Sequence, residues 1–195
     1  SVTTFGSLNT GSMVFIKKLT ASSSSTLSFV NGTSDVVLDS TYKEYVFTLN
    51  NMHPQTSGNN PKMTASTNTG SSYGVTATTT DFRATHDESG GSTGVTYRTA
   101  TDLAQSTDPV HIFGGTGTGN ENDECAVGII HLFNPSSTTF VKHFIARTHG
   151  YSDDDRAYSN FSAGYFNTTS AIDAIQFANA SGNMDAGDIC LYGIL

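Results

Sequence analysis

The sequence has no tryptophan, and charged residues make up 13% of its 195 positions, about half the share that is usual in globular proteins. It has two cysteines and four prolines. No stretch approaches the ~20 consecutive apolar residues of a membrane-spanning helix. Residues 1–10 lack the basic segment and apolar run that are typical of a secretory signal. We therefore expect no membrane partner. No signal peptide is visible, and a chain whose signal was removed and a chain that lost only its initiator Met are both consistent with this start.

Basic residues are also scarce: 9 lysines and arginines stand against 17 acidic residues, which gives a net charge of −8. The basic residues are scattered along the chain, so the cationic footprint of a nucleic-acid-binding protein is missing. No G-x-S-x-G nucleophile motif is present, and the glycine-rich segment 114–119 lacks the lysine and helix of a phosphate loop. We predict no enzyme activity, no catalytic residue and no cofactor. A hydrolase with two carboxylates from distant strands stays an alternative.

Hydroxyl-bearing residues replace charge on the surface, with 24 serines and 29 threonines in the chain. Hydrophobic residues make up 36% of the sequence and include 12 phenylalanines and 8 tyrosines. This is enough apolar material to bury a core, so we expect a folded chain rather than a disordered one.

Apolar and polar residues alternate with a period of two through most of the chain, which predicts strands. Glycine-, asparagine- and serine-rich turns separate them. The strands are expected at residues 13–20, 24–30, 42–52, 61–67, 73–85, 94–99, 110–113, 124–133, 139–149, 157–167, 171–179 and 188–194. A weak helical pattern occurs at residues 100–105. The fold class predicted is all-β, an antiparallel β-sandwich that is jelly-roll-like, with one domain at residues 13–195 after an arm at residues 1–12.

Histidine and cysteine are the residues that would hold a metal. His131 and His143 flank a turn, and one interpretation has them face each other across a hairpin, where Asp123 or Glu124 would approach them. The plainer interpretation is surface or backbone-bonded histidines, because no H-x-H or H-E-x-x-H spacing is present, and we predict no metal site. Cys125 and Cys190 would form a disulfide if their strands were neighbours, while the missing export signal favours free thiols.

One acidic loop is the clearest candidate for a binding tip. It carries Tyr151, Asp153, Asp154, Asp155 and Arg156. Its carboxylates have the chemistry that calcium prefers, but the alternating spacing of a calcium loop is missing, so a solvated turn is the plainer interpretation.

Three segments resemble a module found in structural proteins of tailed bacteriophages, especially marine ones. They are residues 38–54 (LDSTYKEYVFTLNNMHP), 73–86 (YGVTATTTDFRATH) and 181–195 (SGNMDAGDICLYGIL). The match runs in order along most of the chain, from residue 38 to residue 195, with these three segments as its motifs. The resemblance implies a jelly-roll-like virion component on the capsid surface or the tail, assembled in the host cytoplasm. It brings no catalytic residues.

The implied function is capsid decoration or a tail appendage, as a homo-oligomer with a trimer favoured. The implied partners are other copies and virion proteins such as the major capsid or tail proteins. The alternative is a receptor- or glycan-binding tail-fibre or knob module that meets a host surface glycan. Val2, Phe5 and Leu8 recur every three residues in the otherwise polar arm, so we expect them to anchor it to a neighbouring subunit.

Overall fold

The computed structural model describes residues 12–114 and 117–195, which form eleven strands. The strands are β1 (Met13–Thr20), β2 (Leu27–Val30), β3 (Glu44–Pro54), β4 (Pro61–Ser66), β5 (Ala77–Asp87), β6 (Thr93–Tyr97), β7 (Ala126–Phe133), β8 (Lys142–Tyr151), β9 (Arg156–Phe166), β10 (Ala174–Asn179) and β11 (Met184–Ile194). Within these ranges there is no helix long and apolar enough to cross a bilayer.

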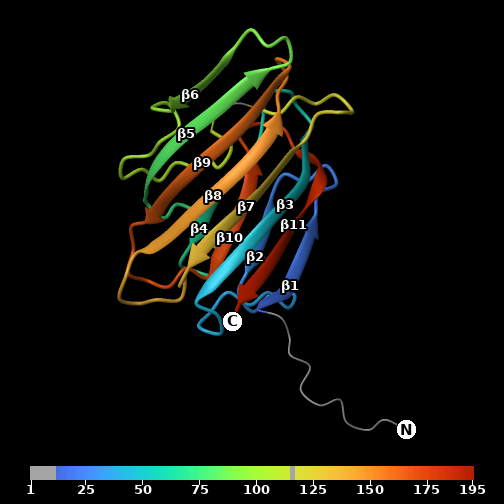
Figure 1. Cartoon of the computed structure of the whole chain (residues 1–195). Coiled ribbons are helices and arrows are strands. Elements are labelled where there is room, and N and C mark those ends of the chain that lie inside the picture. Colours follow the sequence, from blue (N-terminus) through green and yellow to red (C-terminus); the bar gives the residue numbers. More distant parts are fainter. Residues whose placement is uncertain (1–11, 115–116) are drawn as a thin grey trace, which may run out of the picture.

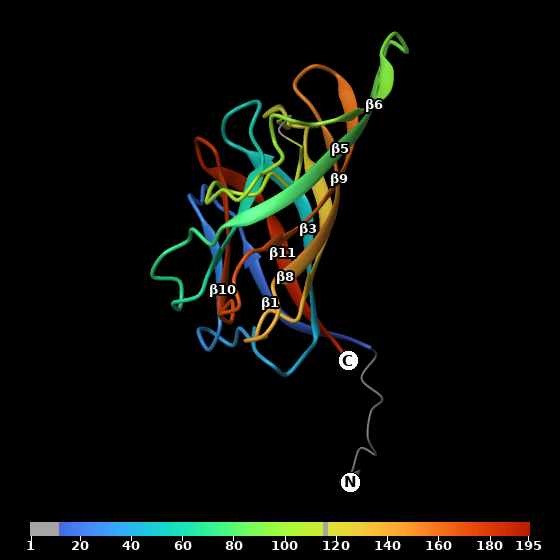
Figure 2. The same ribbon diagram turned by 90° about the vertical axis from the view of Figure 1, so that its left-hand side faces the viewer.

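The strands form two antiparallel sheets of unequal size (Figure 1). The large sheet has eight strands in the order β1-β11-β3-β7-β8-β9-β5-β6, and the small sheet has three in the order β2-β10-β4. The small sheet packs against one face of the large sheet, and β6 lies at the far end from it (Figure 2). The predicted all-β sandwich is thus confirmed, while the jelly-roll arrangement stays a prediction.

The period-two pattern of the sequence determines which side chains enter the core. In β8, Phe144 and Ala146 are buried, whereas the residues that follow each of them, Ile145 and Arg147, are exposed. Successive side chains of a strand point to opposite faces of the sheet. Each strand of the large sheet therefore has an inner face towards the small sheet and an outer face turned away from it.

Three phenylalanines join the two sheets at the centre of the core. Phe29 on β2 and Phe177 on β10 come from the small sheet, and Phe47 on β3 comes from the large sheet. Their rings meet edge to face, with centroids 5.3 Å apart for Phe29–Phe47 and 5.5 Å apart for Phe47–Phe177. All three are fully buried, so this cluster fixes how the sheets pack.

One predicted strand is absent from the structure. Residues 110–113 form no strand, although Val110 makes an isolated bridge to Met63. Their apolar pattern arises because Ile112 and the residues around it are buried beneath the large sheet. Residues 100–105, where the sequence has only a weak helical pattern, lie in a turn and a bend outside any helix, and the Leu103 amide donates to the Thr79 hydroxyl of β5.

Candidate functional site

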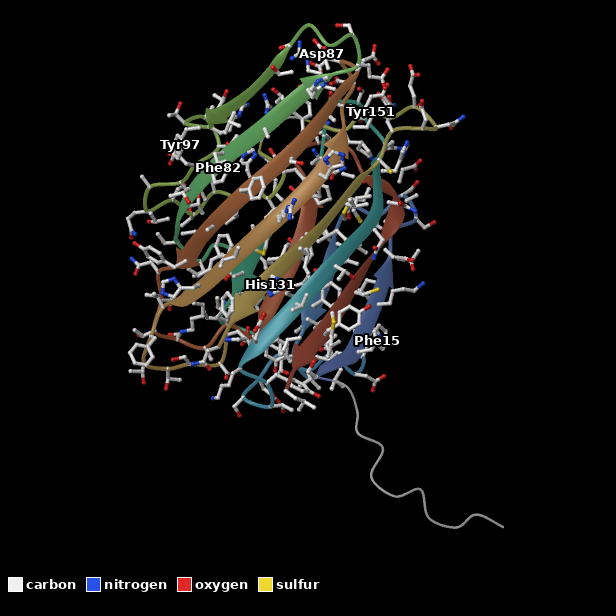
Figure 3. The ribbon with its side chains drawn as sticks, viewed as in Figure 1. Phe15, Phe82, Asp87, Tyr97, His131 and Tyr151 are labelled. Atoms are coloured by element: carbon white, nitrogen blue, oxygen red, sulfur yellow. The ribbon has the colours of Figure 1, made fainter. Side chains whose placement is uncertain are left out.

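The outer face of the large sheet carries a broad set of exposed apolar side chains (Figure 3). Seven large hydrophobic residues on it are between 39% and 72% exposed. They are Met13, Phe15, Phe82, Val95, Tyr97, Val127 and Ile145. The pairing register places all of them on this one side, from the edge strand β1 to the edge strand β6. Exposed apolar side chains that are concentrated on one face of a sheet favour an interaction site there.

An aromatic row crosses four strands at one end of the outer face. Tyr97 lies opposite Phe82, which lies opposite Phe161, which lies opposite Arg147. The Phe82 and Phe161 rings stack with centroids 4.9 Å apart and planes 6° from parallel. The Arg147 guanidinium lies 5.3 Å from the Phe161 ring centroid, an attractive cation–π geometry.

The charged groups of the outer face are not mainly acidic, in contrast to the chain as a whole. Lys18 and Arg147 lie on it, with four histidines. The histidines are His86, His131, His143 and His149. Among the outer-face residues that pair across strands, two carry carboxylates, Asp188 and Glu44. The Asp188 carboxylate lies 3.3 Å from the Lys18 ammonium. The negative charge of the molecule therefore lies largely elsewhere.

The interpretation that has His131 and His143 face each other across a hairpin is wrong. β7 and β8 do form a hairpin, but His131 lies opposite Ile145 instead of His143. The carboxylate that reaches His131 Nδ1, at 2.5 Å, belongs to Glu44 on the neighbouring β3 instead of the acidic segment before β7. Among the described residues, no three His, Cys, Asp or Glu side chains converge in a metal-binding arrangement.

The acidic loop is a turn whose side chains bond mainly to one another. The Tyr151 hydroxyl donates to Asp155 at 3.1 Å, which raises the pKa of Tyr151 to about 12. Asp154 pairs with Arg156 at 3.0 Å and accepts from the Tyr158 hydroxyl and from Ser152.

Asp153 lies apart from these pairs, and its carboxylate accepts from the Ser57 hydroxyl at 3.2 Å. The five predicted tip residues are thus together, and most of their polar groups already have protein partners.

The other predicted groups are simpler to place. Val2, Phe5 and Leu8 of the arm lie outside the described residues. Cys125 and Cys190 are free thiols, the first half-buried and the second buried.

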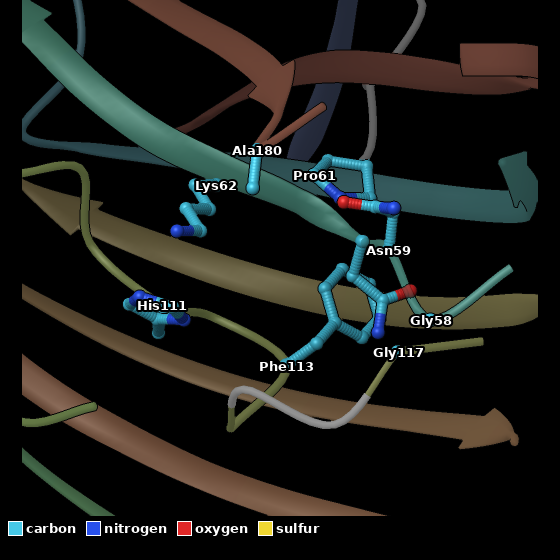
Figure 4. A pocket seen from close by; sticks show the side chains of 9 residues that line it. Gly58, Asn59, Pro61, Lys62, His111, Phe113, Gly117 and Ala180 are labelled. Atoms are coloured by element: carbon cyan, nitrogen blue, oxygen red, sulfur yellow. The ribbon is translucent and has the colours of Figure 1, made fainter. Parts of the chain in front are cut away.

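A second candidate is a cavity of about 230 Å³ at the start of β4 (Figure 4). We call it the Lys62 pocket. Its lining residues are Gly58, Asn59, Asn60, Pro61, Lys62, His111, Phe113, Gly117 and Ala180. In Figure 4 the Lys62 and His111 side chains lie on one side of the cavity, and Asn59, Phe113 and Gly117 lie on the other.

Hydrogen bonds from the sandwich hold the walls of the Lys62 pocket in place. Met63 and Val110 exchange backbone hydrogen bonds of 3.0 and 2.9 Å, which brings the segment with His111 beside β4. The Ser162 hydroxyl of β9 donates to the His111 carbonyl at 3.1 Å. On the opposite wall, the Thr118 hydroxyl donates to Asn60 at 2.6 Å.

The two nitrogen-bearing side chains of this pocket differ in charge. Burial, together with the nearby Lys62 ammonium, lowers the pKa of His111 to about 4, and Asp108 opposes this. His111 is therefore neutral at pH 7, with one ring nitrogen as donor and the other as acceptor. Burial also lowers the pKa of Lys62. Within the described part of the chain, neither the Lys62 ammonium nor the His111 ring has a hydrogen bond or an ion pair.

Sequence reasoning missed both the outer face and the Lys62 pocket. A signal for the outer face was present, because β3 and β7 carry apolar residues on both faces, including Val46 and Ile129. For the pocket there was none: Lys62 and His111 are distant in the sequence, and only the bridge between Met63 and Val110 brings them together.

Comparison with known proteins gives no match to a protein-family model, to a curated protein or to a solved structure.

Proposed function

We propose that this chain is a non-enzymatic structural protein of a tailed-bacteriophage particle, where copies of it join one another through the outer face. The observation that carries the proposal is the exposed apolar outer face of the large sheet. The resemblance of residues 38–54, 73–86 and 181–195 to phage structural proteins supports the setting. The jelly-roll relationship and the partners, other virion proteins and further copies, belong to the same proposal.

The amount of apolar surface is suited to a protein interface. Three of the seven residues are aromatic, and aromatic side chains bring ~150–250 Å² each to an interface; at about half exposure these three offer on the order of 300 Å². A standard interface buries ~800 Å² on each partner. The three rings therefore supply a substantial part of such an interface, and the four other side chains add to it.

The charge of the outer face favours a second copy as the occupant. Two copies of a chain with net charge −8 repel each other at most orientations. The outer face carries Lys18, Arg147 and four histidines beside its two carboxylates, Asp188 and Glu44. Two copies can therefore approach through this face without strong repulsion between acidic groups. A surface that binds itself forms a closed pair about a two-fold axis, so this contact would give a dimer in place of the trimer favoured from the sequence.

Copy number tests the setting. Quantitative mass spectrometry of purified particles, from a phage whose genome encodes this chain, is expected to find it as a stoichiometric component. Hundreds of copies would place it on the capsid, and a few dozen or fewer on the tail. Its absence from purified particles would overturn the proposal.

A further inference from the structure

We infer that β6 is a pairing edge, where the β6 strand of a second copy of this chain adds to the large sheet in the antiparallel sense. The inference goes beyond assembly through the outer face, because it uses the edge of the sheet instead. β6 is the last strand of the large sheet, and all of its residues are exposed. It lies clear of the small sheet (Figure 2), so a second copy has room to approach it.

The hydrogen bonds between β5 and β6 show which backbone groups of β6 are already used. In an antiparallel pair, alternate residues exchange hydrogen bonds with the neighbouring strand. Just before β6, the Ser92 carbonyl accepts from the Asp87 amide at 3.0 Å. Just after β6, the Arg98 amide donates to the Asp81 carbonyl at 2.9 Å. The register between these two bonds is unbroken, so every second residue counted from Ser92 bonds to β5.

The other backbone groups of β6 face the free edge. Gly94 and Thr96 occupy the positions that bond to β5. Thr93, Val95 and Tyr97 therefore turn their N–H and C=O groups away from β5. In the described part of the chain no strand lies beyond β6, so these groups are left for water or for a second chain. An unpaired row of this kind is a template for another strand.

The other sheet edges carry features that hinder such pairing. β1, at the opposite end of the large sheet, has a register shift between Phe15 and Lys17 and two consecutive lysines, Lys17 and Lys18. In the small sheet, Met63 of β4 exchanges backbone hydrogen bonds with Val110, which covers that edge, and β2 has only four residues. Bulges, lysines, covering segments and short strands are the means by which proteins protect sheet edges.

The residues of β6 suit a second copy of the same strand. The strand has no bulge, no proline and no charged residue, so two copies of a chain with net charge −8 can meet there without repulsion between like charges. About a two-fold axis, Val95 lies opposite Val95 of the second copy, and Tyr97 lies opposite Thr93. Val95 is 72% and Tyr97 50% exposed, and pairs of aromatic and β-branched residues across strands are stabilising.

Pairing through β6 alone is weak, because an isolated two-stranded contact is at best marginally stable in water. We therefore expect it at millimolar rather than micromolar concentration. Copies tethered close together on one particle reach effective concentrations in the millimolar range. There the edges would pair and continue the large sheet from one copy into the next.

The test uses Ile145→Lys, in which the outer-face contact is disrupted, and measures amide hydrogen exchange by NMR at micromolar and at millimolar concentration. In the dilute sample the Thr93, Val95 and Tyr97 amides should exchange rapidly, while the amides of the two residues bonded to β5 are protected. In the concentrated sample the exchange of the first three should slow at least about tenfold. Sedimentation equilibrium should show the mass rising from monomer towards dimer over the same range.

Val95→Pro in this background is the decisive variant. It removes an N–H that faces the free edge and that β5 does not use, a position at which a strand tolerates proline. We expect it to stay monomeric at millimolar concentration. The matched control, Val95→Thr, keeps the N–H and a β-branched side chain and should pair as before. The amide spectrum away from β6 shows whether Val95→Pro is folded.

Three results would overturn the inference. The first is an unchanged exchange rate of the Val95 amide at the two concentrations, and the second is a dimer that persists in Val95→Pro. The third is growth past a dimer with new protection of β1, which would indicate head-to-tail pairing of β6 with β1. The outer-face proposal is judged separately, on the unaltered chain at micromolar concentration, where pairing through β6 is not expected.

Discussion

His111 is held neutral in a wall of the Lys62 pocket, where it faces the Lys62 ammonium and the Asp108 carboxylate. Its pKa is about 4 in the folded chain against an ordinary 6.5, chiefly through burial. As pH falls below 6.5 the unfolded chain takes up the proton first. The stability that depends on a neutral His111 is therefore complete above pH 6.5 and is lost as pH falls towards 4.

The variant His111→Gln removes this titration and should flatten the pH dependence. Its free energy of unfolding is expected to rise relative to that of the unaltered chain as pH falls through that window, because only the unaltered chain loses the stability that depends on neutral His111. Urea unfolding of both proteins at a series of pH values measures the difference. Parallel pH profiles for the two proteins would contradict the assignment of a buried, neutral imidazole.

Single residues were the hardest part to predict from the sequence. The sequence correctly predicted that the residues of the acidic loop lie together. They are nearly consecutive, so no tertiary contact is needed to bring Tyr151 close to Asp155. Glu44 beside His131, by contrast, depends on β3 pairing with β7. Contacts between distant strands depend on the register of the sheet, which period-two patterning leaves open.

Among the elements, the small sheet depends most on its aromatic contacts. Phe177 on β10 touches Phe29 on the neighbouring β2 and Phe47 on the large sheet. β10 is also the central strand that pairs with β2 and β4. Removing this ring leaves a cavity at the junction of all three contacts.

Phe177→Ala is expected to lower the free energy of unfolding by about 3–5 kcal/mol, the usual loss for a buried phenylalanine. Chemical denaturation measures it. The matched control is Phe140→Ala, because Phe140 is 69% exposed in a loop; the expected change there is within about 0.5 kcal/mol. Similar losses in the two variants would show that the Phe177 cluster does not hold the sheets together.

The elements themselves followed well from periodicity. β1 occupies the predicted residues 13–20, and most other strands differ from their predicted bounds by a few residues. The segment 110–113 failed because an apolar stretch can be buried without joining a ladder: the Ile112 carbonyl accepts from the Thr148 side chain, where a strand would use a neighbouring backbone. A hydrophobic pattern indicates that a segment is buried, but the segment is a strand only if a neighbouring backbone pairs with it.

For the whole molecule, the width of the large sheet is the feature that creates a functional surface. It has eight strands against three in the small sheet, and in a two-layer sandwich the outer face of each sheet has no covering layer. The sequence predicted two layers but not this imbalance, because β11, from the end of the chain, enters the large sheet between β1 and β3. That insertion is a property of topology, which local patterns do not determine.

Assembly through this face is sensitive to charge placed at its centre. Ile145 is 53% exposed on β8, a central strand of the large sheet. Ile145→Lys would put an ammonium into the apolar contact while leaving the core untouched. Phe140→Lys adds the same charge at an exposed loop position outside the outer face and serves as the control.

Sedimentation-velocity centrifugation of the unaltered chain, Ile145→Lys and Phe140→Lys, at micromolar concentration, tests the central claim most directly. The account predicts an oligomer for the unaltered chain and for Phe140→Lys, and a monomer of 20.6 kDa for Ile145→Lys. A monomeric unaltered chain, or an oligomer that survives Ile145→Lys, would contradict it.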